Sequence, residues 1–446
     1  SGQIAFRSSE PISYAWFDTA GAGPSFIWVV AVDGTQLRQV TFPSNSGGGH
    51  GKPAWNPDGR RIAFVATGQD GGIEVLDLES GQRQLVVRVG RDIPLQPGTW
   101  LTRLWDPRWG TDGRSLYFSA MSGPGEYAIY YLSALNRRPV LFYSTQTDVP
   151  AGISLDPAGK RLLFTRFANV SQLWGVTPPE DPAPVFQESV LRAYLPVFSP
   201  DGKWLSFLVE TAGRNRDLWI MDTATRRVAP VSLDPGPKEG SAGWNLAGTA
   251  LLYSYVNGDR NEFRRYDPAR NTNQTVASWP VGRFFHPVLT PDEKEILGAC
   301  STPFNICLSS LDGASRRQIT LERSNASYPV ISHDGEWIAY GLHRGDSVQL
   351  VVTDRAGRSR QMLTDDNGLH WPYSFSADAR RIAYAAYRAG VWNVWWVDRV
   401  TGEQRQLTHY TTYGAFVRTP MWRPGTEEIV FEYSQVKGNI YRLDLR

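Results

Sequence analysis

The sequence is poor in several features that mark common functional classes. It has two cysteines and six lysines in 446 residues, against forty arginines, and its formal net charge is +2. A charge so close to balance does not predict strong attraction to nucleic acid or to an anionic membrane. No apolar run reaches the length that a membrane-spanning helix needs. We therefore expect neither a nucleic-acid partner nor a membrane span.

Familiar catalytic motifs are also missing. The sequence has no G-x-S-x-G nucleophile elbow, no phosphate-binding loop and no dinucleotide-binding fingerprint between a strand and a helix. The glycine run at 47–49 precedes no helical pattern, so it does not predict a phosphate cradle. These absences favour a protein that is not an enzyme.

What the sequence does have is a recurring pattern, first seen as "KPAWNPDGRRIAF" at 52–64. Asn56 and Pro57 suit the first two positions of a type I turn, and Gly59 tolerates a positive φ at its end. The flanking residues group apolar side chains over a few positions, as strands do. The stretch therefore predicts a strand, a tight turn and a second strand. Because proline lacks an N–H group, we expect Pro53 at the very start of its strand.

The pattern repeats along the chain every 42 to 54 residues. The position of Gly59 recurs at Gly113, Gly159, Gly202, Gly248, Glu293, Gly335, Ala379 and Thr426. Each copy continues with a second apolar strand, a third strand that ends near an aspartate and a fourth strand such as "RRQIT" or "RQMLT". Four strands at a period of about 40–45 residues are typical of propeller blades, which bury their faces by stacking on one another.

These repeats resemble the TolB-type, WD40-like repeat, and the resemblance covers nearly the whole chain. "WNPDGRRIAFVA" (55–66) and "FSPDGKWLSFLV" (198–209) carry it most clearly, while the units around 153–159, 242–248 and 287–293 are degenerate. The resemblance implies a β-propeller that is exported to the periplasm, the cell surface or the medium, and that binds a partner.

We predict an all-β fold with a single domain over 1–446. This domain would be one propeller of four-stranded antiparallel blades, about nine in number with a range of eight to ten. Eight complete repeats span 53–408, and the partial units 1–42 and 419–446 supply complementary sets of strands. Because a closed ring leaves no unpaired edge, we expect the N- and C-terminal strands to share a blade.

The loops from each fourth strand to the next first strand should lie together at the mouth of the channel, where a rigid base presents them to a ligand. Aromatic and arginine side chains, which are enriched at protein contacts, are frequent in these loops. The predicted binding residues are Trp100, Trp105, Arg283, Phe285, His286, His370, Trp371, Tyr410 and Tyr413. We expect a protein or peptide partner first and a carbohydrate second.

Four of the six histidines fall on the same predicted face, namely His50, His286, His370 and His409. Histidines that converge at a channel mouth can bind a transition metal, and TolB-like polysaccharide lyases resemble this arrangement. The spacing matches no local ligand motif, so we prefer the interpretation that polar and aromatic loop residues line an interaction face without a metal. A metal-dependent polysaccharide lyase or hydrolase is therefore the first alternative function, and a propeller that gates a peptidase is the second. His343 follows a second strand and is not placed on this face.

Both cysteines lie in "ACSTPFNIC" (299–307), where Cys300 ends a second strand and Cys307 begins a third. Neighbouring antiparallel strands can bring two cysteines to bridging distance, so we expect either a Cys300–Cys307 disulfide or two buried thiols. A disulfide would agree with an oxidising, extracytoplasmic compartment.

The repeats, the channel-mouth loops and the missing catalytic motifs together make a non-enzymatic recognition scaffold without a cofactor the leading prediction.

Overall fold

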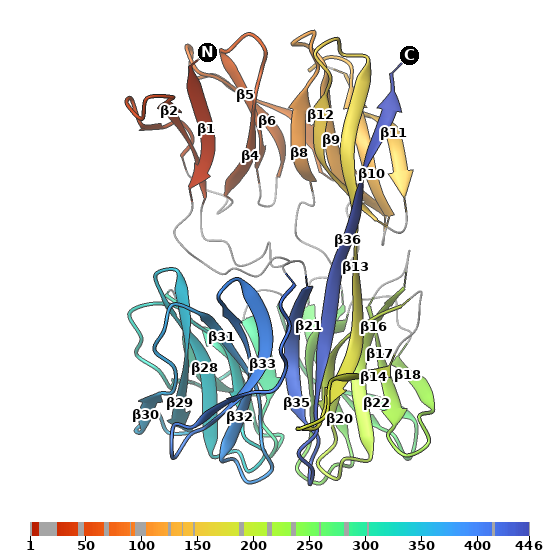
Figure 1. Ribbon diagram of the computed structural model, residues 1–446, viewed down its shortest axis with the longest axis vertical. Coiled ribbons are helices and arrows are strands. Elements are labelled where there is room, and N and C mark those ends of the chain that lie inside the picture. Colours follow the sequence, from red (N-terminus) through yellow and green to blue (C-terminus); the bar gives the residue numbers. More distant parts are fainter. Residues whose placement is uncertain are drawn as a thin grey trace. The chain divides into compact units, whose positions relative to one another are not determined.

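Each repeat forms an antiparallel meander of strands in the computed structural model (Figure 1). The structure describes residues 2–8, 25–42, 49–66, 71–89, 91–93, 104–123, 126–135, 137–145, 148–186, 191–211, 216–232, 238–257, 260–280, 285–300, 303–412 and 415–445. Every regular element in these ranges is a strand, and none of them contains a helix that could span a membrane. The predicted all-β propeller fold with four-stranded antiparallel blades is confirmed.

The chain divides into two compact units. Unit 1 contains the described residues up to 168 together with 437–445, and unit 2 contains those of 169–211 and 216–436. This differs from the single domain that we predicted over 1–446.

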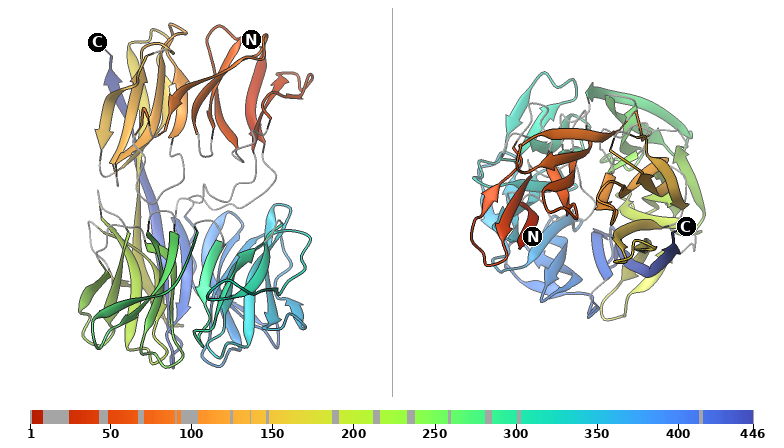
Figure 2. Two further views of the ribbon diagram at one scale, coloured as in Figure 1. Left: turned by 180° about the vertical axis from the view of Figure 1, so that it is seen from behind. Right: turned by 90° about the horizontal axis from the view of Figure 1, so that it is seen from above.

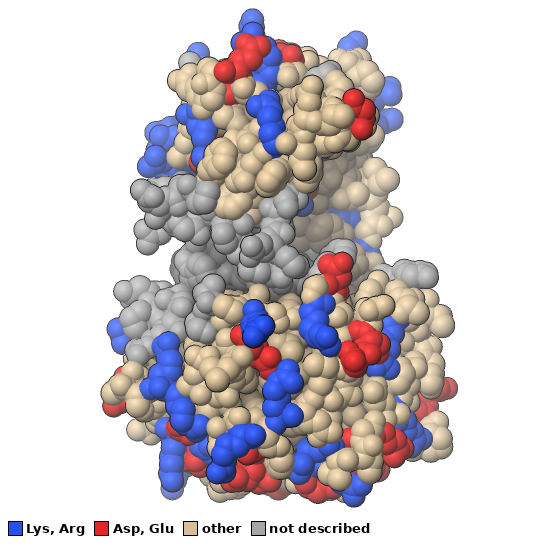
Figure 3. All heavy atoms as spheres, turned by 90° about the vertical axis from the view of Figure 1, so that its left-hand side faces the viewer, with Lys and Arg blue, Asp and Glu red and all other residues tan. Residues whose placement is uncertain are grey.

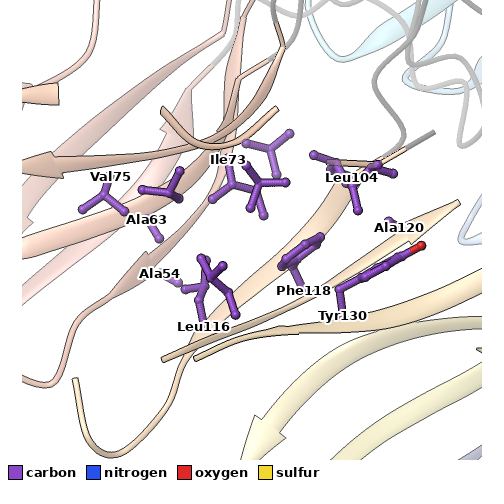
Figure 4. Packing of buried hydrophobic residues seen from close by; sticks show 14 of the residues in the cluster. Ala54, Ala63, Ile73, Val75, Leu104, Leu116, Phe118, Ala120 and Tyr130 are labelled. Carbon is purple, nitrogen blue, oxygen red and sulfur yellow. The ribbon is translucent and has the colours of Figure 1, made fainter. Parts of the chain in front are cut away.

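Unit 1 is a row of four sheets. Its strands are β1 (Gln3–Ser8), β2 (Phe26–Ala31) and β3 (Arg38–Gln39); β4 (His50–Trp55), β5 (Arg61–Ala66), β6 (Gly72–Asp77) and β7 (Arg83–Arg88); β8 (Leu104–Trp109), β9 (Leu116–Gly123), β10 (Glu126–Leu132) and β11 (Val140–Thr145); and β12 (Val149–Leu155) with parts of β13 (Arg161–Val176) and β36 (Ile429–Asp444). Contacts run from β1 to β4, from β4 to β8 and from β8 to β12. Between the second and third sheets lies a cluster of buried apolar residues that includes Ala63, Ile73, Leu116 and Phe118 (Figure 4).

Unit 2 is a closed ring of six meanders, set around a central axis in Figure 2. Its strands are β15 (Leu191–Phe198), β16 (Trp204–Thr211), β17 (Arg216–Asp222) and β18 (Val228–Ser232); β19 (Lys238–Trp244), β20 (Leu251–Asn257), β21 (Arg260–Asp267) and β22 (Thr272–Pro280); β23 (Phe285–Leu289), β24 (Glu295–Cys300), β25 (Asn305–Ser310) and β26 (Arg316–Gln318); β27 (Ala326–Ile331), β28 (Trp337–Arg344), β29 (Ser347–Asp354) and β30 (Arg360–Met362); β31 (Leu369–Phe375), β32 (Arg381–Arg388), β33 (Val391–Asp398) and β34 (Gln404–Gln406); and β35 (Ala415–Trp422) with β36, β13 and β14 (Ala183–Phe186). The innermost strands contact one another in the order β15, β19, β23, β27, β31, β35 and back to β15.

The way in which the ring closes corrects our prediction. The N-terminal strands β1, β2 and β3 form a sheet of their own, while the C-terminal strands β35 and β36 pair with β13 and β14. The closing blade of unit 2 therefore combines the C-terminus with a segment from the middle of the chain. The N- and C-terminal units have complementary sets of strands, but this did not predict how the ring closes. The segment of β13 matches the strand pattern as well as the N-terminus does, and it is long enough to take part in two sheets.

The repeated turn forms as its sequence predicts. The N–H of Gly59 donates to the carbonyl of Asn56 over 2.9 Å, and Gly59 has a φ of 70°. Pro53, however, lies inside β4 rather than at its start, because the strand register shifts between Gly51 and Ala54. Lys52, which precedes it, has a φ of 55°. This bulge removes the ladder hydrogen bond that proline cannot make, so a proline is tolerated within the innermost strand.

Candidate functional site

The predicted binding residues do not form one set in the structure. Trp100, Arg283 and Tyr413 lie outside the described residues. Phe285 and His286 belong to β23, and their side chains also lie outside the described part. Their roles in binding remain predictions.

Trp105 serves the packing of unit 1. Its indole Nε1–H donates to the carbonyl of Pro150 over 2.8 Å, and its ring meets the ring of Tyr127 edge to face at 6.3 Å. These contacts join β8 to its neighbours β12 and β10. They account for this tryptophan without a ligand.

His370 and Trp371 lie within β31 and are buried, with exposures of 0% and 7%. His370 Nε2 is 2.7 Å from Oδ1 of Asp366, and Arg388 approaches the other oxygen of the same carboxylate at 3.1 Å. Burial lowers the pKa of His370 more than Asp366 raises it. His370 is therefore a neutral, fully buried imidazole held by a carboxylate whose own side chain is 43% exposed.

The four candidate metal ligands belong to two different units. His50 is in unit 1, where it is 2% exposed and lies 3.0 Å from Nη2 of Arg83. His370 and His409 are in unit 2, and His409 is exposed. Among the described side chains, no three or more of His, Cys, Asp and Glu gather as metal ligands would. Since the side chain of His286 is outside this set, the metal site stays a prediction.

Cys300 and Cys307 form a disulfide between β24 and β25, with their Cα atoms 6.0 Å apart. Both residues are buried. The bond ties the second strand of the blade to its third strand at one end, where the connecting turn is short.

The feature that distinguishes unit 2 is a group of five half-buried aromatic residues, here called the aromatic belt. Its members pack against the core between the last two blades of the ring, and they are Trp174, Tyr373, Trp392, Tyr410 and Tyr433. The rings of Tyr410 and Tyr433 stack at 4.9 Å, and those of Tyr433 and Trp174 lie 5.2 Å apart. Trp174, Tyr433 and Tyr410 thus fix one another's orientation while part of each stays open to solvent.

The belt combines strands that are distant in sequence. Trp174 comes from β13, Tyr373 from β31, Trp392 from β33 and Tyr433 from β36, while Tyr410 follows β34 in the loop to β35. That loop lies on the face where the innermost strands begin, which is the face that the sequence analysis selected. Of the predicted binding residues with described side chains, Tyr410 is the one that joins this surface.

A buried chain of polar groups supports the belt in the closing blade. Nη2 of Arg418 is 2.7 Å from Oε1 of Glu432, and the hydroxyl of Ser434 donates to the same oxygen over 2.8 Å. Ser434 in turn lies 2.6 Å from the hydroxyl of Ser171 on β13. Glu432 is 1% exposed and both serines are 0% exposed. Burial opposes the charge on Arg418, yet Glu432 outweighs it and raises the pKa of the guanidinium.

His343 corrects the sequence analysis, which left it off this face. Its ring meets Trp371 edge to face at 5.4 Å, and its Nε2 is 3.1 Å from the hydroxyl of Ser327. A second strand runs antiparallel to the first, so it ends where the first begins. Burial lowers the pKa of His343 to about 4.

No charge of one sign dominates the side of the molecule that Figure 3 shows. Lysine and arginine side chains alternate there with aspartate and glutamate in both units. Bulk charge therefore does not select a ligand on this side, and the belt is the strongest local feature among the described residues.

Fold and repeats define the chain as a β-propeller protein whose repeats resemble those of TolB. No family model matches it. The uncharacterized peptidase YuxL of Bacillus subtilis (strain 168) is 29% identical over 176 residues, which are 38% of this chain and 24% of YuxL. The chain thus spans about a quarter of the length of this curated relative.

Two solved structures illustrate the similarity in fold. A putative TolB from Agrobacterium tumefaciens is 19% identical, covers 60% of this chain and 99% of its own, and has a TM-score of 0.48. An oligogalacturonate lyase in complex with manganese is 14% identical, covers 61% of this chain and 78% of its own, and has a TM-score of 0.37. Similarity at this level describes the propeller and not the function.

Proposed function

We propose that the protein is a non-enzymatic recognition scaffold that binds an extended peptide segment of a partner protein through the aromatic belt of unit 2. The observation that carries this proposal is that Trp174, Tyr433 and Tyr410 form one run of ring contacts, while Trp392 and Tyr373 pack against the same core cluster, all five half-buried on a closed ring. Tryptophan and tyrosine concentrate binding energy at protein interfaces because each buries a large area at a small cost in side-chain entropy.

The packing of the rings supports a peptide over a carbohydrate. Sugars stack on open aromatic faces, whereas Tyr410 and Tyr433 stack on each other with an interplanar angle of 28°. Rings packed in this way present their edges, between which the apolar side chains of a peptide can insert. The Arg418–Glu432 pair is satisfied internally, so it stabilises the surface and leaves no net charge for an anionic sugar.

The Cys300–Cys307 disulfide supports an extracytoplasmic location, because such bonds persist in oxidising compartments. This location is part of the proposal.

The test starts from a random peptide library displayed on phage and selected on the purified protein. The consensus peptide is then synthesised, and its affinity is measured for the protein and for the Trp392→Ala and Tyr410→Ala variants. We expect at least one variant to lose about 2 kcal/mol of binding free energy, which is about thirtyfold in affinity. Trp204→Ala is the matched control, since Trp204 is another half-buried indole of unit 2 that packs in a different cluster.

An equal loss in the Trp204→Ala control, or a selection without any enriched peptide, would contradict the proposal. A glycan-array signal that Trp392→Ala abolishes would assign the belt to a carbohydrate instead.

A further inference from the structure

Three consecutive blades of unit 2 each hold the loop after their outermost strand with one amide side chain. In the blade of β33 and β34, Oδ1 of Asn393 accepts the hydroxyl of Thr408 over 2.9 Å and the backbone N–H of Tyr410 over 2.8 Å. Nδ2 of the same side chain donates to the carbonyl of Tyr410 over 3.2 Å. Asn393 thus binds both backbone groups of Tyr410, and we call this arrangement the amide clamp.

The two preceding blades contain the same amide clamp. Asn305 holds the backbone N–H and carbonyl of Glu322, and Gln349 holds those of Asp366. In each blade a threonine 15 residues after the amide donates its hydroxyl to the amide oxygen over 2.9 Å. Because asparagine and glutamine both form the clamp, this position needs an amide and not one particular side-chain length.

The residue that each clamp holds reaches the next blade of the ring. Oε1 of Glu322 accepts the Nε–H of Arg360 over 2.7 Å. Asp366 holds the two side chains of β31 and β32 described above. Tyr410 stacks on Tyr433 of β36. The clamps therefore orient the contacts between neighbouring blades on the face where the innermost strands begin.

Tyr410 depends on its clamp more than the two held carboxylates do. Hydrogen bonds and ion pairs fix the side chains of Glu322 and Asp366, whereas the hydroxyl of Tyr410 is buried and makes no hydrogen bond to the residues that the structure describes. Its ring is held by packing, including the stack on Tyr433 at 4.9 Å. The orientation of this ring therefore follows from the backbone of Tyr410, which Asn393 fixes at both hydrogen-bonding groups.

We propose that Asn393 is the positioning residue of the aromatic belt and holds the Tyr410 ring in the orientation that the bound peptide contacts. This inference rests on the proposed function, because it gives Asn393 a role in binding that peptide. Asn393 is 5% exposed, so it acts through the backbone of Tyr410 and not by touching the peptide. A side chain that is already ordered loses less entropy when a ligand binds, so the clamp raises affinity.

The experiment compares Asn393→Leu with Asn305→Leu in the full chain, and its ligand is the consensus peptide from the phage selection. Each substitution removes one clamp and leaves buried polar groups unpaired, so both should lower the melting temperature similarly. Asn393→Leu alone should weaken peptide binding, by about fivefold, because Tyr410 must then be ordered on binding. Asn393→Gln should restore most of the affinity, since Gln349 forms the same clamp.

Two further measurements separate positioning from stability. On the Tyr410→Ala background, Asn393→Leu should cause no further loss of affinity, because the ring that it orients is gone. Without any ligand, hydrogen–deuterium exchange of 407–412 should become faster in Asn393→Leu and stay unchanged in Asn305→Leu. If Asn393→Leu fails to fold, Thr408→Val removes the hydroxyl that braces the clamp, and Thr320→Val is its control.

The outcomes distinguish this inference from the proposed function. If Trp392→Ala and Tyr410→Ala weaken binding but Asn393→Leu does not, the inference is wrong and the proposed function stands. Equal losses of affinity in Asn393→Leu and Asn305→Leu would also overturn the inference, because binding would then follow stability. If the belt substitutions leave binding unchanged while exchange at 407–412 becomes faster in Asn393→Leu, the proposed function is wrong and Asn393 only stabilises the loop.

Discussion

Both halves of β36 carry apolar residues, but the surroundings of the two halves differ greatly. Residues 429–434 lie in unit 2 between β35 and β13, and Ile429, Val430 and Phe431 are all 0% exposed. Residues 437–444 lie in unit 1 with β13 on one side, and Ile440 and Tyr441 are 76% and 37% exposed. Apolar residues of one continuous strand thus become core or surface according to whether a strand and a sheet lie beside them.

The first half of β36 closes the ring of unit 2, whereas the second half adds a strand to the last sheet of unit 1. In unit 2 the strand completes a ring, so Ile429, Val430 and Phe431 are covered on both faces. In unit 1 it is the last strand of the last sheet in a row. We expect changes in the first half of β36 to lower stability more than changes in the second half do.

The largest difference between the two halves of β36 should appear when the chain is shortened. Deleting 427–446 removes the second strand of the closing blade and uncovers several large apolar residues, at about 1.5–3 kcal/mol each. The sum is comparable to the whole free energy of unfolding of a typical domain, so unit 2 should not fold stably. Deleting 437–446 should leave unit 2 intact.

Thermal melts and limited proteolysis of the two truncated proteins measure this difference. Cooperative melting of the 427–446 deletion within a few degrees of the full chain would show that β36 does not close the ring.

Single substitutions sharpen the same contrast. Phe431→Ala should lower the free energy of unfolding by about 3–5 kcal/mol, because it leaves a cavity at a fully buried site. Tyr441→Ala should cost less, about 1 kcal/mol, because its ring is partly solvated and stacks on Phe164 at 6.0 Å. Urea denaturation of both variants checks the order, and a larger loss for Tyr441→Ala would reverse our view of the two halves.

Acidification should lower the free energy of unfolding of both units, by less than the deletion and Phe431→Ala do. Burial, with a contribution from Arg83, lowers the pKa of His50 to about 4, and burial lowers that of His343 to about 4. In the unfolded chain these histidines take up a proton near pH 6.5. Between about pH 6.5 and pH 4 the unfolded chain therefore binds more protons, so stability is complete above this window and falls as the pH decreases through it.

The expected loss is about 1 kcal/mol per histidine between pH 6.5 and pH 5.5. Urea denaturation of the protein and of its His343→Asn variant at these two pH values measures it. The variant should show the smaller pH dependence, and equal slopes would show that His343 is not neutral in the folded state.

Much of the local structure was predictable because it depends on neighbouring residues. The turn at Asn56–Gly59 and the third strand around Ile306 follow from proline, glycine and apolar spacing. The face that we propose for binding was predicted as a whole, since all loops of one kind lie at one end of a propeller, and Tyr410 lies on it; its role in binding stays a proposal. Trp174, Tyr373 and Tyr433 were missed because they lie inside strands, where an aromatic residue looks like core.

By itself the sequence determined the type of blade, the repeat length and the position of the tight turns, because each depends on contacts within about 45 residues. Only the tertiary structure decided that the chain makes a ring and a separate row of sheets, and that β13 rather than the N-terminus completes the ring. Several segments of this chain carry interchangeable strand patterns, so local sequence cannot select among them. The selection depends on which pairing buries both faces of every sheet, and this is a property of the assembled molecule.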